Sequence, residues 1–141
     1  MDTREDAHGL LKEAKEDLAR AARYSSLMDW VTVTHYAQLA IEKSAKAVIA
    51  CFEAFEWTHD PSEQMERLAA QGLLSHDVRE IGLYAREAAP WHGRSTYGGP
   101  RNGRWQTPSE LCTEAVAADL LGKARKCADR ASAFIEKAFQ R

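Results

Sequence analysis

Residues 29–55 of this chain read DWVTVTHYAQLAIEKSAKAVIACFEAF. Apolar or small side chains recur along this stretch with the period of an amphipathic α-helix. They are Val33, Ala37, Ala40, Ser44, Val48, Cys51 and Phe55. Ile41, Ile49 and Phe52 lie beside this stripe and widen it. The stretch therefore predicts one long helix from Asp29 to Phe55, covered on more than one side and central to the fold.

The same period predicts helices on both sides of this central helix, and no stretch alternates with the period of a strand. We expect these helices over residues 4–24, 61–72, 76–88 and 108–139. Their capping residues are Thr3, Asp60, Ser75 and Thr107. The predicted fold class is all-α: a four- to five-helix antiparallel up-and-down bundle with a long loop before the last helix. The second and last long helices are expected to run antiparallel at its centre.

The overall composition indicates one ordinary globular domain spanning residues 1–141. The hydrophobic share is 45% and the charged share 28%, and the net charge of −2 gives the whole molecule no general attraction for nucleic acid. Residues 1–20 are charged throughout, and no apolar run approaches the ~20 residues that cross a bilayer. The three cysteines lack metal-ligand spacing. We therefore expect a cytoplasmic protein that does not bind membranes.

Residues 89–106 differ from the rest of the chain. This segment holds four glycines and two prolines, which predict a loop of about 18 residues without helix or strand. It also contains no acidic residue but several basic and aromatic ones, namely Trp91, His92, Arg94, Tyr97, Arg101, Arg104 and Trp105. Arginines neutralise phosphate and aromatic rings stack on bases, so the segment is a candidate nucleotide or RNA site. Alternatively, the tryptophans pack on the bundle and the arginines are simply solvated.

Three motifs resemble those of one known family. Residues 38–47 read QLAIEKSAKA, which resembles a Gln-x-Ala-x-Glu-Lys-x-x-Lys-Ala signature. Thr58-His59-Asp60 resembles a Thr-His-Asp/Asn motif before a short third helix. Residues 94–97, RSTY, stand where that family often has Ser-Arg-Tyr-Pro. Together the motifs resemble the HEPN family (higher eukaryotes and prokaryotes nucleotide-binding domain), whose members are small helical domains associated with nucleotides or RNA.

The resemblance implies that the polar edge of the central helix formed by Glu42 and Lys46 lines a cleft against the loop. Lys43 and Lys46 are candidate nucleotide- or RNA-binding residues. The residues themselves leave another interpretation open. Glu42 and Lys46 are four residues apart in the favourable order, which also fits a solvent-facing ion pair worth ~0.3–0.5 kcal/mol. His59, just before a predicted helix cap, is interpreted as a polar helix-start residue.

Many members of this family are metal-independent endoribonucleases that use an arginine followed, after four to six residues, by a histidine. Arg86 and His92 have five residues between them and match this spacing. The histidine would take the proton of a 2′-hydroxyl group, and the arginine would stabilise charge on the phosphate. Arg86 stands in the helix before the loop, whereas the family's pair stands at or just after the loop, on the final helix. No two histidines have metal-ligand spacing, so we predict no metal site and no cofactor.

Three functions follow from these observations. The first is a nucleotide- or RNA-binding module, acting in a toxin–antitoxin-type pair with a small nucleotidyltransferase partner, as the resemblance implies. The second is a metal-independent endoribonuclease that uses Arg86 and His92. The third is a helical adaptor whose loop and tryptophans dock onto another protein or onto a second copy of the chain. The resemblance also implies a homodimer.

Overall fold

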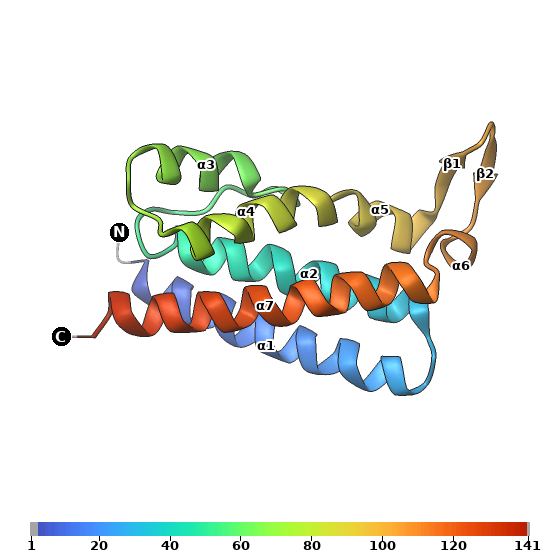
Figure 1. Ribbon diagram of the computed structural model, residues 1–141, viewed down its shortest axis with the longest axis horizontal. Coiled ribbons are helices and arrows are strands. Elements are labelled where there is room, and N and C mark those ends of the chain that lie inside the picture. Colours follow the sequence, from blue (N-terminus) through green and yellow to red (C-terminus); the bar gives the residue numbers. More distant parts are fainter. Residues whose placement is uncertain (1–2, 141) are drawn as a thin grey trace.

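The structure is a computed structural model that describes residues 3–140, and it is almost entirely helical (Figure 1). Its elements are α1 (Arg4–Ser26), α2 (Trp30–Ile49), α3 (Ser62–Ala70), α4 (His76–Ala88), α5 (Pro90–Tyr97), β1 (Gly99–Arg101), β2 (Arg104–Gln106), α6 (Pro108–Leu111) and α7 (Glu114–Ala138). The two strands form one small hairpin, so the predicted all-α helical bundle is confirmed. Within residues 3–140, no helix has the length and hydropathy needed to cross a bilayer.

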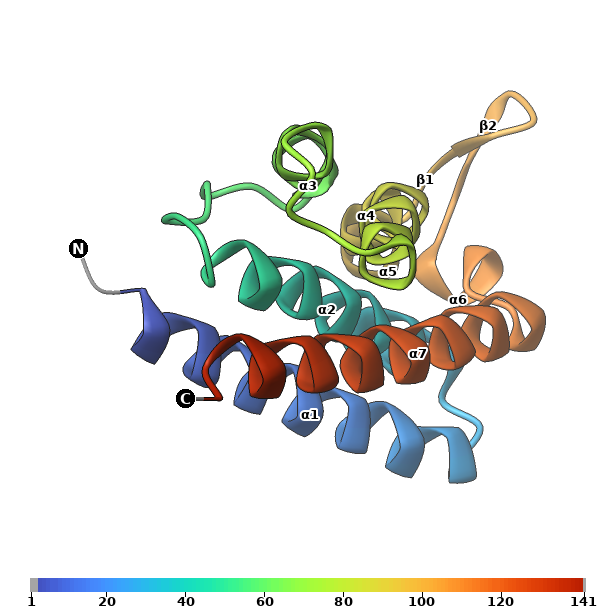
Figure 2. The same cartoon turned by 60° about the vertical axis from the view of Figure 1, so that its left-hand side comes forward.

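Helix α2 is the centre of the bundle, as its wide apolar stripe predicts. It packs against α1, α7, α4 and α5, which surround it in Figure 2. Every residue from 44 to 50 is buried, and such a run is longer than one helical turn. No side of this part of α2 therefore faces solvent.

Helix α2 ends at Ile49, and the predicted extension to Phe55 is wrong. The backbone N–H groups of Cys51 and Phe52 donate to carbonyls three residues earlier, which tightens and ends the last turn. Phe55 nevertheless folds back onto the helix, since Lys46 Nζ lies 5.4 Å from the centre of its ring. A turn after the helix thus brings Phe55 back beside Lys46, and its ring is partly buried against the core.

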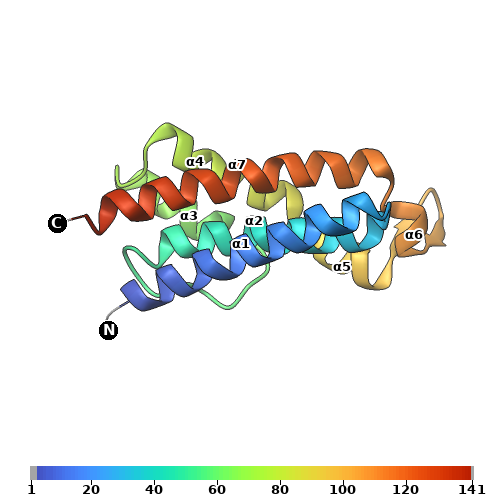
Figure 3. The ribbon, with the colours of Figure 1, turned by 90° about the horizontal axis from the view of Figure 1, so that it is seen from below.

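The direction of the last helix also differs from the prediction. Figure 1 shows α2 and α7 starting at the same end of the bundle, with α1 and α4 running the other way. The expected antiparallel arrangement of the second and last long helices is therefore wrong. Because α4 and α5 together make one complete return pass, α7 starts where α2 starts. Seen from below, α1 and α7 lie along α2 (Figure 3).

The segment 89–106 is ordered into a helix and a hairpin, so the prediction of a long loop there is wrong. Pro90 occupies the first turn of α5, where a missing N–H group costs nothing. Gly98 ends α5 with φ +80°, and a Cβ atom there would lie 2.2 Å from the Gln106 carbonyl oxygen. Asn102 and Gly103, both with positive φ, form the two-residue turn of the hairpin. The glycines and prolines allow these elements instead of excluding them.

The predicted last helix is divided into α6 and α7. Thr107 and Glu110 form the predicted capping box at the start of α6. The chain then breaks at Cys112, and Thr113 caps α7 by accepting a hydrogen bond from the Val116 N–H group. The division arises because Thr113 supplies a second helix start that competes with the first.

The other three predicted capping residues differ in whether their side chains accept a hydrogen bond at the helix start. The side chains of Thr3 and Ser75 make no capping hydrogen bond, although α1 and α4 begin directly after them. Asp60 Oδ1 accepts a hydrogen bond from the backbone N–H group of Ser62, the first residue of α3. Helix starts are thus predicted within one or two residues, even where the capping contact differs.

Candidate functional site

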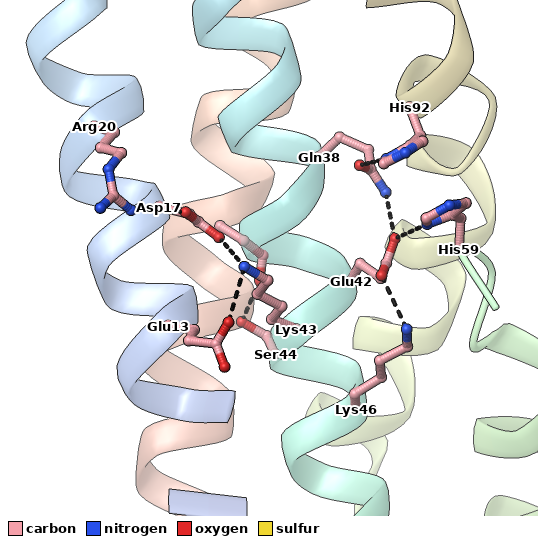
Figure 4. Close-up of polar contacts among 11 residues, drawn as sticks. Glu13, Asp17, Arg20, Gln38, Glu42, Lys43, Ser44, Lys46, His59 and His92 are labelled. Carbon is pink, nitrogen blue, oxygen red and sulfur yellow. Dashed lines mark hydrogen bonds and ion pairs between the residues drawn. The ribbon is translucent and has the colours of Figure 1, made fainter. Parts of the chain in front are cut away.

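A row of polar side chains lies along the side of α2 that faces α5. Gln38, Glu42 and Lys46 are four residues apart, so all three project from one face of the helix (Figure 4). Gln38 Nε2 donates to Glu42 Oε1 at 3.1 Å, and Lys46 Nζ donates to Glu42 Oε2 at 3.0 Å. All three residues are buried, with at most 6% of their surface exposed. The solvent-facing ion pair considered from the sequence is therefore a buried pair.

Two histidines from distant parts of the chain complete this row. His92 on α5 has Nδ1 3.1 Å from Gln38 Oε1, and His59, before α3, has Nδ1 3.3 Å from Glu42 Oε1. Their rings stack with centres 3.6 Å apart and an interplanar angle of 18°. We refer to Gln38, Glu42, Lys46, His59 and His92 as the histidine cluster. It joins α2, the segment between α2 and α3, and α5.

The hydrogen bonds define which nitrogen of His92 carries a proton. A carboxylate only accepts hydrogen bonds, so the Gln38 amide must turn its NH₂ group to Glu42 and its oxygen to His92. An amide oxygen also only accepts, so His92 Nδ1 is the donor. Nε2 of the neutral ring is then left with a free lone pair.

Burial lowers the pKa of His92 below its ordinary value, and charge on the nearby His59 lowers it further. His35 on α2 stands next to this ring, with ring centres 5.8 Å apart, and its Nδ1 lies 3.1 Å from Ser95 Oγ. Burial lowers the pKa of His35 as well. Both imidazoles are therefore neutral at neutral pH and can accept a proton or bind a cation.

Arg86 and His92, the sequence-predicted catalytic pair, interact with different helices. Arg86 Nη2 donates to Glu66 Oε1 at 2.8 Å, and its Nε donates to Ser62 Oγ at 3.4 Å, so this side chain is held against α3. His92 instead faces α2 through Gln38. The break between α4 and α5 at Pro90 does not join the two side chains.

A second feature of α5 is a basic pocket of about 590 Å³ between α5, the hairpin and the start of α7. We define the arginine pocket by three of its lining residues, Trp91, Arg94 and Arg101. The Arg94 guanidinium lies over the Trp91 ring, 5.1 Å from its centre. Acidic residues are absent from the lining, and within residues 3–140 neither arginine forms an ion pair. The pocket is therefore an uncompensated positive site.

The other sequence-predicted binding residues lie outside this pocket. Arg104 is exposed and has Nη2 3.7 Å from Glu110 Oε2, and Tyr97 is 75% exposed. Lys46 belongs to the histidine cluster.

The second lysine of α2, Lys43, faces α1, where its Nζ lies 2.7 Å from Asp17 Oδ2 and 3.2 Å from Glu13 Oε1. The structure thus brings together Trp91, Arg94 and Arg101, and separates Lys43 from them.

Sequence reasoning missed the roles of Gln38 and His59, and it expected Glu42 to face the loop without indicating its histidine partner. His59 is not only a helix-start residue, because its ring stacks on His92 and contacts Glu42. Signals were present, since Gln38 and Glu42 belong to the signature of the central helix and His59 to the Thr-His-Asp motif. Nothing in the spacing of positions 38, 59 and 92 indicates that they meet.

Comparison with known proteins identifies the family. No curated protein matches the chain significantly. A solved structure, the crystal structure of TT1696 from Thermus thermophilus, is similar to it with a TM-score of 0.67 and 22% sequence identity. This similarity covers 99% of the present chain and 100% of the other, and it supports the fold. A family model described as the HEPN domain matches residues 7–138. Because this match spans nearly the whole chain, the protein belongs to the HEPN domain family.

Proposed function

We propose that this HEPN-family protein binds nucleotide or RNA phosphate in the arginine pocket. The observation that carries the proposal is the pairing of two arginines without acidic partners and a half-buried tryptophan around one cavity. The chain as a whole carries a net charge of −2, so this positive site is local. An anionic ligand is the partner that such a site favours.

The residue types suit the two parts of a nucleotide. The planar guanidinium groups of Arg94 and Arg101 offer paired N–H donors that match phosphate oxygens. The Arg94 guanidinium lies over the Trp91 ring, 5.1 Å from its centre, and both planar groups can stack on a base. A cavity of about 590 Å³ is within the range of pockets that hold small molecules.

The proposal can be tested by removing the two arginines together. We expect the Arg94→Ala/Arg101→Ala variant to bind a labelled single-stranded oligoribonucleotide, or ATP, about 100-fold more weakly than the wild type. Each charge-assisted hydrogen bond is worth ~1.5–3 kcal/mol, and the variant loses at least two. Fluorescence anisotropy measures the oligoribonucleotide, and competition against it measures ATP.

The matched control removes the same number of positive charges from outside the arginine pocket. Arg79 on α4 and Arg125 on α7 are exposed and do not line the pocket, so Arg79→Ala/Arg125→Ala should leave the affinity within a few-fold of the wild type. Arg104→Ala should have a smaller effect than either pocket arginine. If the control variant loses as much affinity as the pocket variant, binding reflects overall charge and the proposal fails.

The other functions inferred from the sequence receive less support. The endoribonuclease hypothesis needs Arg86 beside His92, and Arg86 is engaged with Glu66. The adaptor hypothesis predicts that exposed rings dock onto a protein, for which Trp105 and Tyr97 are available. The nucleotidyltransferase partner, the homodimer and the cytoplasmic location remain predictions.

A further inference from the structure

The histidine cluster contains a set of potential metal ligands that the sequence did not indicate. Glu42, His59 and His92 each offer one ligand atom, and these atoms all lie within 4.8 Å of one another. We propose that these three side chains form a binding site for a divalent transition metal ion of the Zn²⁺ class. This proposal does not depend on nucleotide binding in the arginine pocket.

One separation in the cluster already has the length found in a metal site, and the others are at most 4.8 Å. Zinc binds histidine nitrogen and carboxylate oxygen at about 2.0–2.2 Å, so two ligand atoms in tetrahedral geometry lie about 3.3 Å apart. Glu42 Oε1 and His59 Nδ1 are 3.3 Å apart. The ion would replace the hydrogen atom between them. The His59 and His92 rings are stacked nearly parallel, so His59 must turn out of the stack before both rings can direct a nitrogen at one ion. The side chain of His59 is 62% exposed, which leaves room for this turn.

The neighbours of these ligands already act as supporting residues do in metal sites. Metal-binding histidines usually donate their second ring N–H group to an oxygen acceptor, which fixes the tautomer and ring orientation. His92 donates Nδ1–H to Gln38 Oε1, which leaves the Nε2 lone pair free for the ion. Lys46 holds the other oxygen of Glu42, Oε2, and thereby orients the carboxylate. Glu42 is buried, so this orientation is well fixed.

The ligand types narrow the choice of ion. Two imidazoles and one carboxylate suit Zn²⁺, Co²⁺ and Ni²⁺, whereas Mg²⁺ and Ca²⁺ prefer ligand sets made of oxygen. The three ligands come from α2, from the segment before α3 and from α5. A bound ion would therefore link three parts of the chain and stabilise the fold.

The test is a titration with metal alone, in the absence of nucleotide. Untagged protein is stripped with EDTA, and Zn²⁺ is titrated by calorimetry at about pH 7.5, where imidazole is neutral. Co²⁺ is followed in parallel by its visible absorption. We expect saturable binding of one ion per chain, no saturable binding of Mg²⁺, and a Zn²⁺-dependent rise in the melting temperature.

Single-residue variants test which side chains bind the ion. Loss of an outer-shell partner typically weakens metal binding by ~10–100-fold, so His59→Ala, which removes a ligand, should weaken it by about 100-fold or more. His59 is exposed, and the variant should remain folded. The matched control is His76→Ala, because the exposed His76 pairs with the partly buried Glu80, and within residues 3–140 no third potential ligand joins this pair. This control should bind Zn²⁺ as the wild type does.

Three outcomes would overturn the proposal. They are the absence of saturable Zn²⁺ binding up to about 1 mM, wild-type affinity in His59→Ala, and an equal loss in His76→Ala. Circular dichroism of His59→Ala confirms that a loss of binding is not a loss of folding. The pocket variant Arg94→Ala/Arg101→Ala should keep wild-type Zn²⁺ affinity, so failure of one proposal is distinguishable from failure of the other.

Discussion

The two sides of α2 carry polar clusters of different kinds, and Figure 4 shows both. Toward α1, Lys43 contacts Glu13 and Asp17, and Asp17 also accepts a hydrogen bond from Arg20 at 3.0 Å. Toward α5, Glu42 and Lys46 form the buried ion pair of the histidine cluster. Both clusters start from neighbouring positions of one helix, since Glu42 and Lys43 are adjacent in the sequence.

The two clusters differ in the chemical groups they contain and in which of these groups can still bind a ligand. The α1-facing cluster pairs two carboxylates, Glu13 and Asp17, with two cations, Arg20 and Lys43. The histidine cluster adds two imidazoles, and His92 keeps a free nitrogen after its hydrogen bond to Gln38. We infer that the first cluster serves the packing of α1 on α2. The histidine cluster has imidazole nitrogens that can bind a ligand from outside the chain.

The largest expected difference between the two clusters concerns their lysines. Lys46→Met removes the cation beside a buried carboxylate, which should lower the free energy of unfolding by about 3–5 kcal/mol. Lys43→Met should cost less, about 1–3 kcal/mol, because Asp17 keeps Arg20 and Lys43 is partly exposed. Urea unfolding measures both values. A larger loss for Lys43→Met would mean that the α1-facing cluster is the more important for stability.

A smaller effect is expected in the dependence of stability on pH. The pKa of His35 is lowered by burial in the folded protein, so the unfolded chain binds its proton first as the pH falls. Stability from this group is complete above the ordinary histidine pKa of about 6.5 and decreases as the pH falls through the folded pKa. His35→Gln, which keeps a partner for Ser95, should therefore reduce the loss of stability between about pH 7 and pH 5. An unchanged pH profile, measured by thermal unfolding, would contradict this assignment.

Much of the fold could be predicted from local patterns. The stripe along the central helix correctly indicated a buried core element, and the Thr107–Glu110 capping box formed where it was expected. Composition alone does not predict the hairpin, because the glycines and prolines of 89–106 also fit a loop without regular structure. Asn102-Gly103 is in fact a strong signal for a two-residue turn. The relative direction of α2 and α7 depends on whether α4 and α5 make a full return pass, which local periodicity does not specify.

The candidate site was predictable only in part. Trp91, Arg94 and Arg101 could be selected from composition, because a concentration of arginine and aromatic residues is visible in the sequence. The histidine cluster was not predictable, since residues 42, 59 and 92 come from three segments without regular spacing. Arg86 matches a spacing rule, yet in the folded chain its guanidinium donates a hydrogen bond to Glu66 Oε1 at 2.8 Å. Spacing indicates contacts within one helix, but contacts between segments require the tertiary structure.

The most direct test of the proposed function is the salt dependence of RNA binding. For single-stranded nucleic acid, each phosphate contact contributes about 0.7 to the slope of log affinity against log salt. If Arg94 and Arg101 each contact a phosphate, the slope of the Arg94→Ala/Arg101→Ala variant should be shallower than that of the wild type by about 1.4. The Arg79→Ala/Arg125→Ala control should keep the wild-type slope. An equal slope in the wild type and the pocket variant would contradict phosphate binding in the arginine pocket.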